Sequence, residues 1–265
     1  MNKIGIISGS GTLPVIAAKN ASSMGYDVYS ICFKNHTSKE IEKYSNARYF
    51  PIGNFSDPVR FLKENGVDEV ILLGTVSHIN IFRDIRPDIR AAKFLFNLKN
   101  KTPLGILKSI EKELLKDGIK IIDSTVFLKE LMAPADLIAG RITDNDLNQI
   151  KYGFSIAKKI AEMDIGLTVA IKDYSVIAVE AIEGTDECIK RAGELLKGES
   201  FIIIKVSRPD QDFKFDLPVI GTKTVENASK AGAKIIAVEA DKTIIVDKEK
   251  TVEHAKKLDV SIVGI

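Results

Sequence analysis

The chain has 265 residues, of which 45% are hydrophobic and 28% are charged, a composition typical of globular proteins and unlike that of disordered chains. At roughly 150 residues per domain, this length predicts two domains. Lysine and arginine (38) outnumber aspartate and glutamate (36) by only 2, so no bulk positive charge favours nucleic-acid binding. The apolar runs are far shorter than the roughly 20 residues of a membrane-spanning helix, which excludes a transmembrane protein.

The N-terminus and the cysteines predict a cytoplasmic protein. The apolar stretch Ile4–Ile7 is followed at once by Ser8–Gly11, too early for the apolar segment of about 7–15 residues in a secretory signal. Cys32 and Cys188 are too few for a disulfide framework. Three dispersed histidines do not favour a zinc site.

The first third of the chain alternates short β-branched runs with helical patterns. Strands are expected at Ile4–Ser8, Val28–Phe33, Tyr49–Ile52 and Glu69–Leu73, and helices at Val15–Met24, Ser38–Tyr44 and Asp57–Asn65. Such alternation is typical of right-handed βαβ units around a parallel sheet. It predicts an N-terminal Rossmann-like domain over residues 1–140.

The rest of the chain changes rhythm. Helices are expected at Arg83–Leu98, Leu104–Lys116 and Asn145–Met163 (capped by Asp144 or Asn145), with a strand at Lys120–Ile122 and an irregular connection at Ser124–Arg141. After these, a hairpin is expected around Asp173–Ser175, then strands at 201–206, 235–239, 243–246 and 261–263, and helices at 186–196, 224–231 and 250–258. Hairpin strands mixed with crossovers predict a C-terminal α/β domain with a mixed sheet over residues 141–265.

A glycine-rich turn, Gly9-Ser10-Gly11-Thr12-Leu13-Pro14, follows the first strand and opens the first helix. Its backbone could approach a phosphate at the helix N-terminus. Pro14 stands where a dinucleotide fingerprint has its third glycine, and no acidic residue ends the second strand, so a nicotinamide cofactor is disfavoured. The turn also lacks the Gly-Lys-Ser/Thr ending of a P-loop. Two interpretations stay open: a nucleotide or sugar-phosphate site, or a tight turn with proline early in the helix.

A charged loop, Lys205–Pro218, follows an apolar strand and carries three aspartates, and we call it the acidic loop. Aspartate oxygens at this spacing can hold Mg²⁺ and orient a water for attack on phosphorus. The cations Lys205, Arg208 and Lys214 could balance phosphate charge. The alternative is a solvated loop whose charges pair with one another, and the sequence favours neither.

Two glutamates are expected at strand ends. The run Ile177–Ala181 recurs unchanged as Ile236–Ala240, which predicts Glu180 and Glu239 at the carboxyl ends of two strands. Open α/β sheets bind ligands at this edge, although common strand composition also explains the repeat. In Glu180–Asp186, helix capping by Thr185 or Asp186 explains one polar residue but not two glutamates as well.

Taken together, four stretches resemble the LpxI-type UDP-2,3-diacylglucosamine pyrophosphatases over nearly the whole chain. They are Gly9–Pro14, Ala178–Asp186, Gln211–Gly221 and Ala237–Ala240. The resemblance implies a two-domain cytoplasmic enzyme of lipid A biosynthesis that hydrolyses UDP-2,3-diacylglucosamine to UMP and 2,3-diacylglucosamine 1-phosphate with Mg²⁺. It also implies that the substrate lies between the domains and that water attacks the phosphorus nearer the glucosamine.

The residue patterns and the resemblance together assign the site. Asp216 first, and Asp212 second, are the expected catalytic residues, and both are the expected Mg²⁺ ligands. The other carboxylates that stay open as Mg²⁺ ligands are Glu180, Glu183, Asp186 and Glu239. The expected substrate-binding residues are Gly9, Ser10, Gly11, Thr12, Leu13, Glu183, Gly184, Thr185, Asp186, Lys205, Lys214 and Glu239. The expected partner is the glycolipid nucleotide, with transient contact with the inner face of the membrane and no nucleic acid. The sequence leaves the oligomeric state open, a homodimer included.

The chain departs from the family pattern at three positions. Leu167 stands where a glutamine is expected after Gly166, Asp241 replaces a glycine, and Lys214 replaces an arginine. The lysine would turn a bidentate phosphate contact into a single-point one. These departures motivate the alternative, a non-catalytic protein that binds a nucleotide sugar or a lipid.

Overall fold

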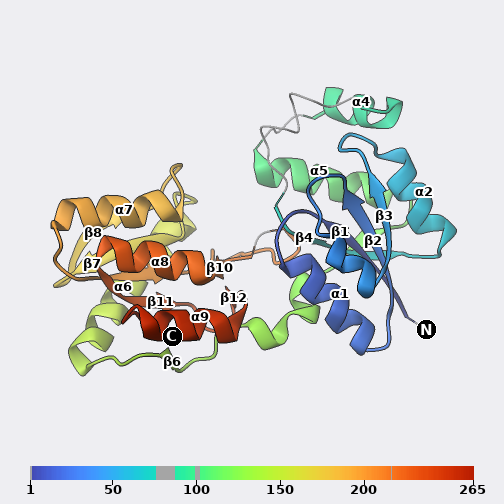
Figure 1. The fold of residues 1–265 in the computed structure, drawn as a ribbon. Coiled ribbons are helices and arrows are strands. Elements are labelled where there is room, and N and C mark those ends of the chain that lie inside the picture. The colour runs from blue at the N-terminus through green and yellow to red at the C-terminus, as the bar shows by residue number, and fades with distance from the viewer. Residues whose placement is uncertain (1, 76–86, 99–101, 216) are drawn as a thin grey trace. The chain divides into compact units, whose positions relative to one another are not determined.

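The structure, a computed structural model, describes residues 2–75, 87–98, 102–215 and 217–265. The chain forms two compact units (Figure 1). The first comprises Met1–Lys129 and Asp212–Phe215, and the second comprises Glu130–Gln211 and Asp216–Ile265. Residues 130–140, expected in the first domain, thus fall in the second unit, and four residues of the acidic loop fall in the first. Within the described residues, no helix is long and apolar enough to cross a membrane.

The first unit contains a parallel sheet of Rossmann type, as expected. Its strands are β1 (Lys3–Ser8), β2 (Asp27–Phe33), β3 (Asn46–Phe50), β4 (Glu69–Leu73) and β5 (Lys120–Ile121). They pair in the order β3-β2-β1-β4-β5, and every pair is parallel. The order reverses between β1 and β4, the position at which open α/β sheets form a crevice.

Helices complete the first unit. They are α1 (Leu13–Ser23), α2 (Ser56–Glu64), α4 (Ile89–Phe96) and α5 (Pro103–Leu115), with 3-10 turns at Lys39–Lys43 and Ser124–Phe127. The apolar faces of α2 and α5 form one core with the sheet, in which Phe61, Leu62 and Leu114 pack against Ile31 and Val70. The helix expected at Arg83–Leu98 is observed from Ile89, and positions 83–86 lie outside the described residues.

The second unit contains a mixed sheet of six strands, again as expected. They are β6 (Leu137–Ala139), β7 (Thr168–Lys172), β8 (Ser175–Val179), β9 (Phe201–Lys205), β11 (Ala233–Val238) and β13 (Ser261–Gly264). Their order is β6-β13-β11-β9-β7-β8, with β9, β11 and β13 parallel and β6 and β7 antiparallel to their neighbours. A separate pair, β10 (Val219–Ile220) and β12 (Ile244–Ile245), was not expected as such, since only the second strand has a sequence signal.

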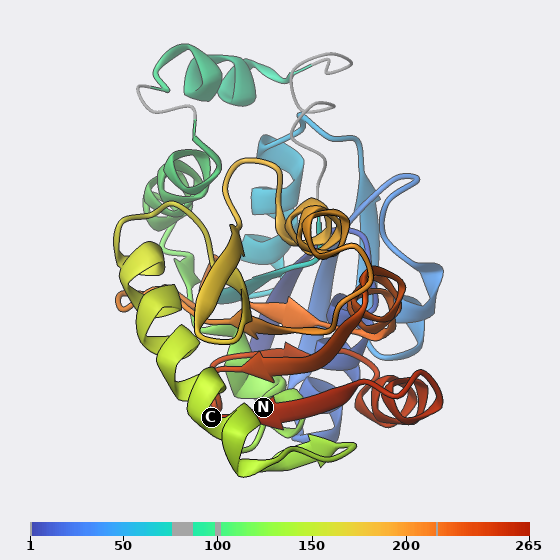
Figure 2. The same ribbon diagram turned by 90° about the vertical axis from the view of Figure 1, so that its left-hand side faces the viewer.

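Helices cover both faces of this mixed sheet (Figure 2). On one face lies α6 (Asp144–Glu162), whose Ile150, Ala157 and Ala161 pack against Val169 and Ile204. On the other face lie α7 (Thr185–Leu196), α8 (Thr222–Ala231) and α9 (Lys248–Lys257). The central strands are therefore buried on both sides, which explains why β9 reads as the uninterrupted apolar run Phe201–Ile204.

Two local features show how the sequence sets these elements. Asp173 (φ 45°) and Tyr174 (φ 57°) both adopt left-handed conformations, the pattern of a two-residue hairpin turn between β7 and β8. Helix α6 is capped by Thr143, and not by Asp144 or Asn145 as expected. The Thr143 hydroxyl accepts the Asp146 amide, and the Asp146 carboxylate accepts the Thr143 amide, so a reciprocal capping box fixes the start one residue earlier.

Candidate functional site

The charged residues of the second unit gather at one edge of its sheet. Strand β8 is antiparallel to β7, which is antiparallel to β9, so β8, β9 and β11 all end at the same edge. Glu180 directly follows β8, Lys205 ends β9 and Glu239 directly follows β11. Backbone hydrogen bonds from Glu180 to Thr168 (2.8 Å) and from Glu239 to Lys205 (3.1 Å) hold the strand ends in register. The expectation from the repeated strand sequence is met: both glutamates occupy the edge.

A chain of side-chain hydrogen bonds links three of these elements. The Lys205 ammonium, on a residue only 8% exposed, donates to the Thr185 hydroxyl at 2.7 Å. Thr185 donates in turn to Glu180 Oε1 at 3.0 Å, and the Thr168 hydroxyl lies 3.4 Å from that of Thr185. Glu180 Oε2 is buried without a hydrogen-bond partner in the described part of the chain. The network therefore places three groups in one cluster: the nearly buried Lys205 ammonium, the Thr185 hydroxyl and the Glu180 carboxylate, of which one oxygen accepts no hydrogen bond from the described residues.

Thr185 belongs to this cluster because it does not cap its helix. The N-cap of α7 is Gly184 at φ 82°, and it makes no side-chain cap hydrogen bond. Thr185 is the first helical residue, which leaves its hydroxyl for Lys205 and Glu180. A second glycine is also needed here, because a Cβ on Gly166 would lie 2.0 Å from the Glu180 carbonyl oxygen.

The Glu239 carboxylate accepts hydrogen bonds from two residues of the second unit, Ser207 and Lys158. Its Oε2 accepts the Ser207 amide and the Ser207 hydroxyl, each at 2.8 Å, and both carboxylate oxygens accept the Lys158 ammonium at 3.0–3.1 Å. Burial alone would raise the pKa of the Glu239 carboxyl, but these donors outweigh it and lower the pKa. Glu239 is therefore an ionised, buried anchor at the strand edge.

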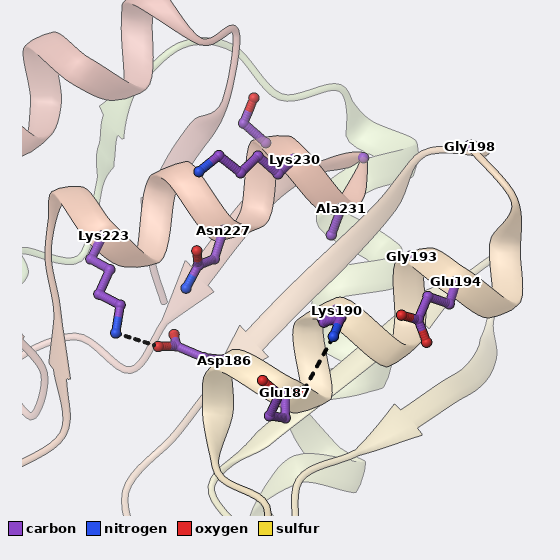
Figure 3. Close-up of a pocket in the computed structure, with 12 residues that line it drawn as sticks. Asp186, Glu187, Lys190, Gly193, Glu194, Gly198, Lys223, Asn227, Lys230 and Ala231 are labelled. Atoms are coloured by element: carbon purple, nitrogen blue, oxygen red, sulfur yellow. Dashed lines mark ion pairs between the residues drawn. The ribbon is translucent and has the colours of Figure 1, made fainter.

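The other two acids of the α7 region point elsewhere. Glu183 accepts the Ala181 amide at 3.1 Å and pairs with Arg191 at 2.6 Å. The pKa of its carboxyl is lowered first by its own backbone amide, then by Arg191 and by the Ala181 amide. Asp186 pairs with Lys223 of α8 at 3.1 Å across a hollow of about 670 Å³ between α7 and α8 (Figure 3). The structure thus does not join Glu183 or Asp186 to the Lys205 cluster.

In the first unit, the glycine-rich turn lies at the reversal of strand order. Gly9 donates its amide to Leu73 at 2.8 Å, and Ser10 exchanges backbone hydrogen bonds with Thr75 at 2.9 and 3.0 Å. A Cβ on Gly9 would lie 2.8 Å from backbone atoms of Gly74 and Thr75, so a neighbouring strand end, not a ligand, requires this glycine. The Gly9 and Ser10 amides already donate to backbone carbonyls in this pairing, so they are not available to a phosphate.

The second half of the turn is less crowded by described residues. Gly11 has φ 103°, and a Cβ built there meets no atom of the described residues within 4 Å. Thr12 is the N-cap of α1 and makes no side-chain cap hydrogen bond, while Pro14 lies in the first turn as expected. The amides from Gly11 to Leu13 at this helix end are therefore the part of the motif suited to a phosphate.

The acidic loop crosses from the second unit into the first. Asp212 Oδ1 accepts the Lys214 amide at 3.2 Å, and Asp212 Oδ2 lies 3.5 Å from the Lys214 ammonium. Lys214 also donates to Glu111 of α5 at 2.6 Å, the main cause of its raised pKa, and Ser124 donates to the Phe213 carbonyl at 2.9 Å. The second expected catalytic residue, Asp216, lies outside the described residues.

No ready-made metal cage appears among the described residues: nowhere in that part of the chain do three acidic, histidine or cysteine side chains form a metal-binding group. Mg²⁺ is usually held by one or two carboxylates together with substrate phosphates and waters. Of the two expected Mg²⁺ ligands, Asp212 is the one among the described residues, and its carboxylate faces Lys214.

Two residues of the edge were not anticipated, Lys158 and Ser207. In the sequence of α6, Lys158 stands next to the buried residue Ala157, close to the apolar face of the helix. A lysine at that position is the sequence signal that could have indicated a charge facing the sheet. Its partner Glu239 is 81 residues away, which no local pattern reveals.

The fold and site define a two-unit α/β protein with a phosphate-suited turn in one unit and a charged sheet edge in the other. Residues 3–131 match the LpxI N-terminal domain and residues 134–263 match the LpxI C-terminal domain. The chain belongs to the LpxI family, as the four stretches predict.

One relative matches from end to end. The UDP-2,3-diacylglucosamine pyrophosphatase LpxI of Caulobacter vibrioides is 28% identical over 277 residues, which cover 100% of this chain and 98% of that protein. Among solved structures, the N5-carboxyaminoimidazole ribonucleotide synthetase of Thermotoga maritima matches at 18% identity and a TM-score of 0.25, over 69% of this chain and 42% of that one. That structural likeness is too weak to bear on fold or function.

Proposed function

We propose that this protein hydrolyses the pyrophosphate bond of UDP-2,3-diacylglucosamine, in lipid A biosynthesis, to give UMP and 2,3-diacylglucosamine 1-phosphate. The full-length match to a relative named for this activity, with both family domains in order, is the observation that carries the proposal. In the reaction, a water oxygen bonds to phosphorus, the bridging P–O bond breaks, and UMP leaves with the bridging oxygen. Hydrolysis of this kind needs charge neutralisation and an in-line water more than covalent chemistry.

The described residues support this chemistry at several points. Lys205, held beside Thr185 at 2.7 Å, offers a nearly buried positive charge for a phosphate. The amides of Gly11 to Leu13 offer neutral donors at a helix N-terminus. We assign Asp212 and Asp216 to holding Mg²⁺, which would neutralise charge on the diphosphate, and Asp216 also to orienting the water.

The first test is turnover. Purified protein with Mg²⁺ should release UMP from UDP-2,3-diacylglucosamine, and removing the metal with EDTA should stop release until Mg²⁺ is restored. Asp216→Asn should lower kcat about 10²–10⁴-fold, the usual worth of a general base. Asp210→Asn is the matched control, because Asp210 is an exposed residue of the same loop and should keep wild-type turnover. Wild-type turnover in Asp216→Asn would remove that assignment, and UDP-sugar binding without product would favour the non-catalytic alternative.

The second test locates the attack. We propose attack at the phosphorus nearer the glucosamine, as the family resemblance implies. In ¹⁸O-labelled water the label should then appear in 2,3-diacylglucosamine 1-phosphate and not in UMP. Label in UMP would assign attack to the other phosphorus and correct the proposal.

We also propose that the protein is cytoplasmic and acts at the membrane surface, because its substrate carries two acyl chains. On the outward side of α4, Ile89 and Phe96 are 78% and 91% exposed, with Lys93 between them. Apolar side chains flanked by a cation are typical of helices that lie on bilayers. Co-flotation with vesicles containing anionic lipid, lost in Ile89→Ser/Phe96→Ser, is the expected result, and no flotation would count against membrane contact.

A further inference from the structure

A buried cluster holds Ser207, two residues after the end of β9. We call Lys158, Glu239 and Ser207 the α6 latch. Ser207 is completely buried, and the Lys158 and Glu239 side chains are only 25% and 11% exposed. All three lie in the second unit, where α6 meets the carboxyl ends of β9 and β11.

The latch satisfies every polar group of Ser207. The Ser207 amide and hydroxyl both donate to Glu239 Oε2, and the Ser207 carbonyl accepts the Lys158 ammonium at 2.8 Å. One residue earlier, the Val206 amide donates to Leu167 at 2.9 Å and is still part of the sheet edge. Ser207 is therefore fixed by its two backbone groups and its side chain at the point where regular pairing ends.

The ion pair between Lys158 and Glu239 costs desolvation free energy, because both charges are largely removed from water. Desolvating two charges often offsets their attraction, so such a pair gives little net stability over apolar packing. The ion pair instead fixes the orientation of the backbone at Ser207, because the Ser207 amide, the Ser207 hydroxyl and the Lys158 ammonium all donate to the Glu239 carboxylate. Five residues after Ser207 the chain reaches Asp212, and it reaches Asp216 four residues later.

A surface ion pair nearby provides a comparison. Arg208 donates to Asp164, just after α6, at 2.7 Å, and the Asp164 side chain is 75% exposed. Exposed pairs of this kind contribute little. The start of the loop is thus contacted by a buried charge on α6, at Lys158, and by a solvated charge just after α6, at Asp164.

We propose that Lys158 is a positioning residue for this reaction: through Glu239 it holds Ser207 and so fixes the backbone at the start of the acidic loop, in which Asp212 and Asp216 follow in sequence. The inference rests on the proposed function of the acidic loop. Lys158 needs no contact with the substrate for this role, and its effect passes through the backbone. A displacement of about 1 Å at the reacting groups can cost about 10²-fold in rate.

The test compares four proteins: wild type, Lys158→Met, Lys158→Arg and the surface control Asp164→Asn. Each is assayed for kcat and KM of UMP release at a temperature where circular dichroism shows the variant folded, and amide hydrogen exchange is followed over residues 206–211. Lys158→Met should lower kcat about 10–100-fold, change KM less than about threefold and speed exchange at the Ser207 amide. Lys158→Arg keeps a donor and should recover most of kcat, while Asp164→Asn should stay within about twofold of wild type.

Several outcomes would overturn the role. Wild-type kcat in Lys158→Met would do so, as would a lowered kcat with unchanged exchange at Ser207, because Lys158 would then act by another route. An equal loss in folded Lys158→Arg would also refute positioning by a donor. If Lys158→Met does not fold, Lys158→Gln is measured against the same criteria. Failure of the proposed function is seen separately: the wild type would be inactive or Asp216→Asn fully active, while exchange at Ser207 would still report on the latch.

Discussion

Replacing Glu239 by glutamine should destabilise the second unit at neutral pH. The carboxylate accepts hydrogen bonds from Ser207 at 2.8 Å (twice) and from Lys158 at 3.0–3.1 Å, and Lys242 lies 3.5 Å from Oε1. Glutamine has one acceptor oxygen, so its NH₂ group must face a donor. Breaking a buried charge pair costs about 3–5 kcal/mol, and because Lys158 is partly hydrated we expect the lower end, about 3 kcal/mol. At about 2–4 °C per kcal/mol, the melting temperature should fall by about 6–12 °C.

The pH dependence of this loss follows from the lowered pKa of Glu239. A carboxyl whose pKa is lowered by folding stabilises the native state above its unfolded value, about 4.3, and that stability is lost as pH falls through the folded pKa. The melting-temperature gap between wild type and Glu239→Gln should therefore be full at pH 7 and shrink below about pH 4. Glu253→Gln is the matched control, because Glu253 forms a solvated pair with Lys257 at 2.8 Å. An unchanged melting temperature in Glu239→Gln, or a gap that stays constant down to pH 3, would refute the reasoning.

Two further predictions concern close packing and thiol reactivity. Gly166→Ala should cost about 1–3 kcal/mol, since its Cβ would lie 2.0 Å from a backbone oxygen of Glu180, whereas Gly221→Ala, with its nearest contact at 3.7 Å, should cost less; urea denaturation compares them. Cys32 and Cys188 are fully buried, and burial raises the pKa of their thiols to about 12 and about 11. Neither should react with iodoacetamide at pH 8 until guanidinium unfolds the protein, and stoichiometric labelling of native protein would contradict their burial.

The sheets of both units could be predicted because their signals are local. The continuous apolar run Val70–Leu73 is typical of a buried strand, and the Asp173-Tyr174 turn has hairpin geometry, each within a few residues. The sequence predicts the cap of α6 at Asp144 or Asn145, one or two residues after the observed cap Thr143, because several polar residues near a helix start can act as the cap. Only the reciprocal bonds of Thr143 and Asp146 decide between them.

The candidate site was predictable in composition but not in pairing. The strand repeat indicates that Glu180 and Glu239 share an edge, and the structure places both there. In the part of the chain that the structure describes, one oxygen of Glu180 has no hydrogen-bond partner, whereas Glu239 accepts from Ser207 and Lys158. The contact between Lys158 and Glu239 depends on the position of α6, which is set by its packing on the sheet. The glycine turn shows the same limit: its sequence suggests close approach by a phosphate at Gly9, but the backbone of Gly74 occupies that space.

The excursion of residues 212–215 into the first unit affects how the protein can be synthesised. Phe215 packs on the first unit's core, and Lys214 is the partner of Glu111. A ribosome that has just finished Lys129 has therefore not yet made all of that unit. Residues 212–215 are synthesised only after residues 130–211 of the second unit. The core of the first unit therefore cannot be completed until most of the second unit has been translated.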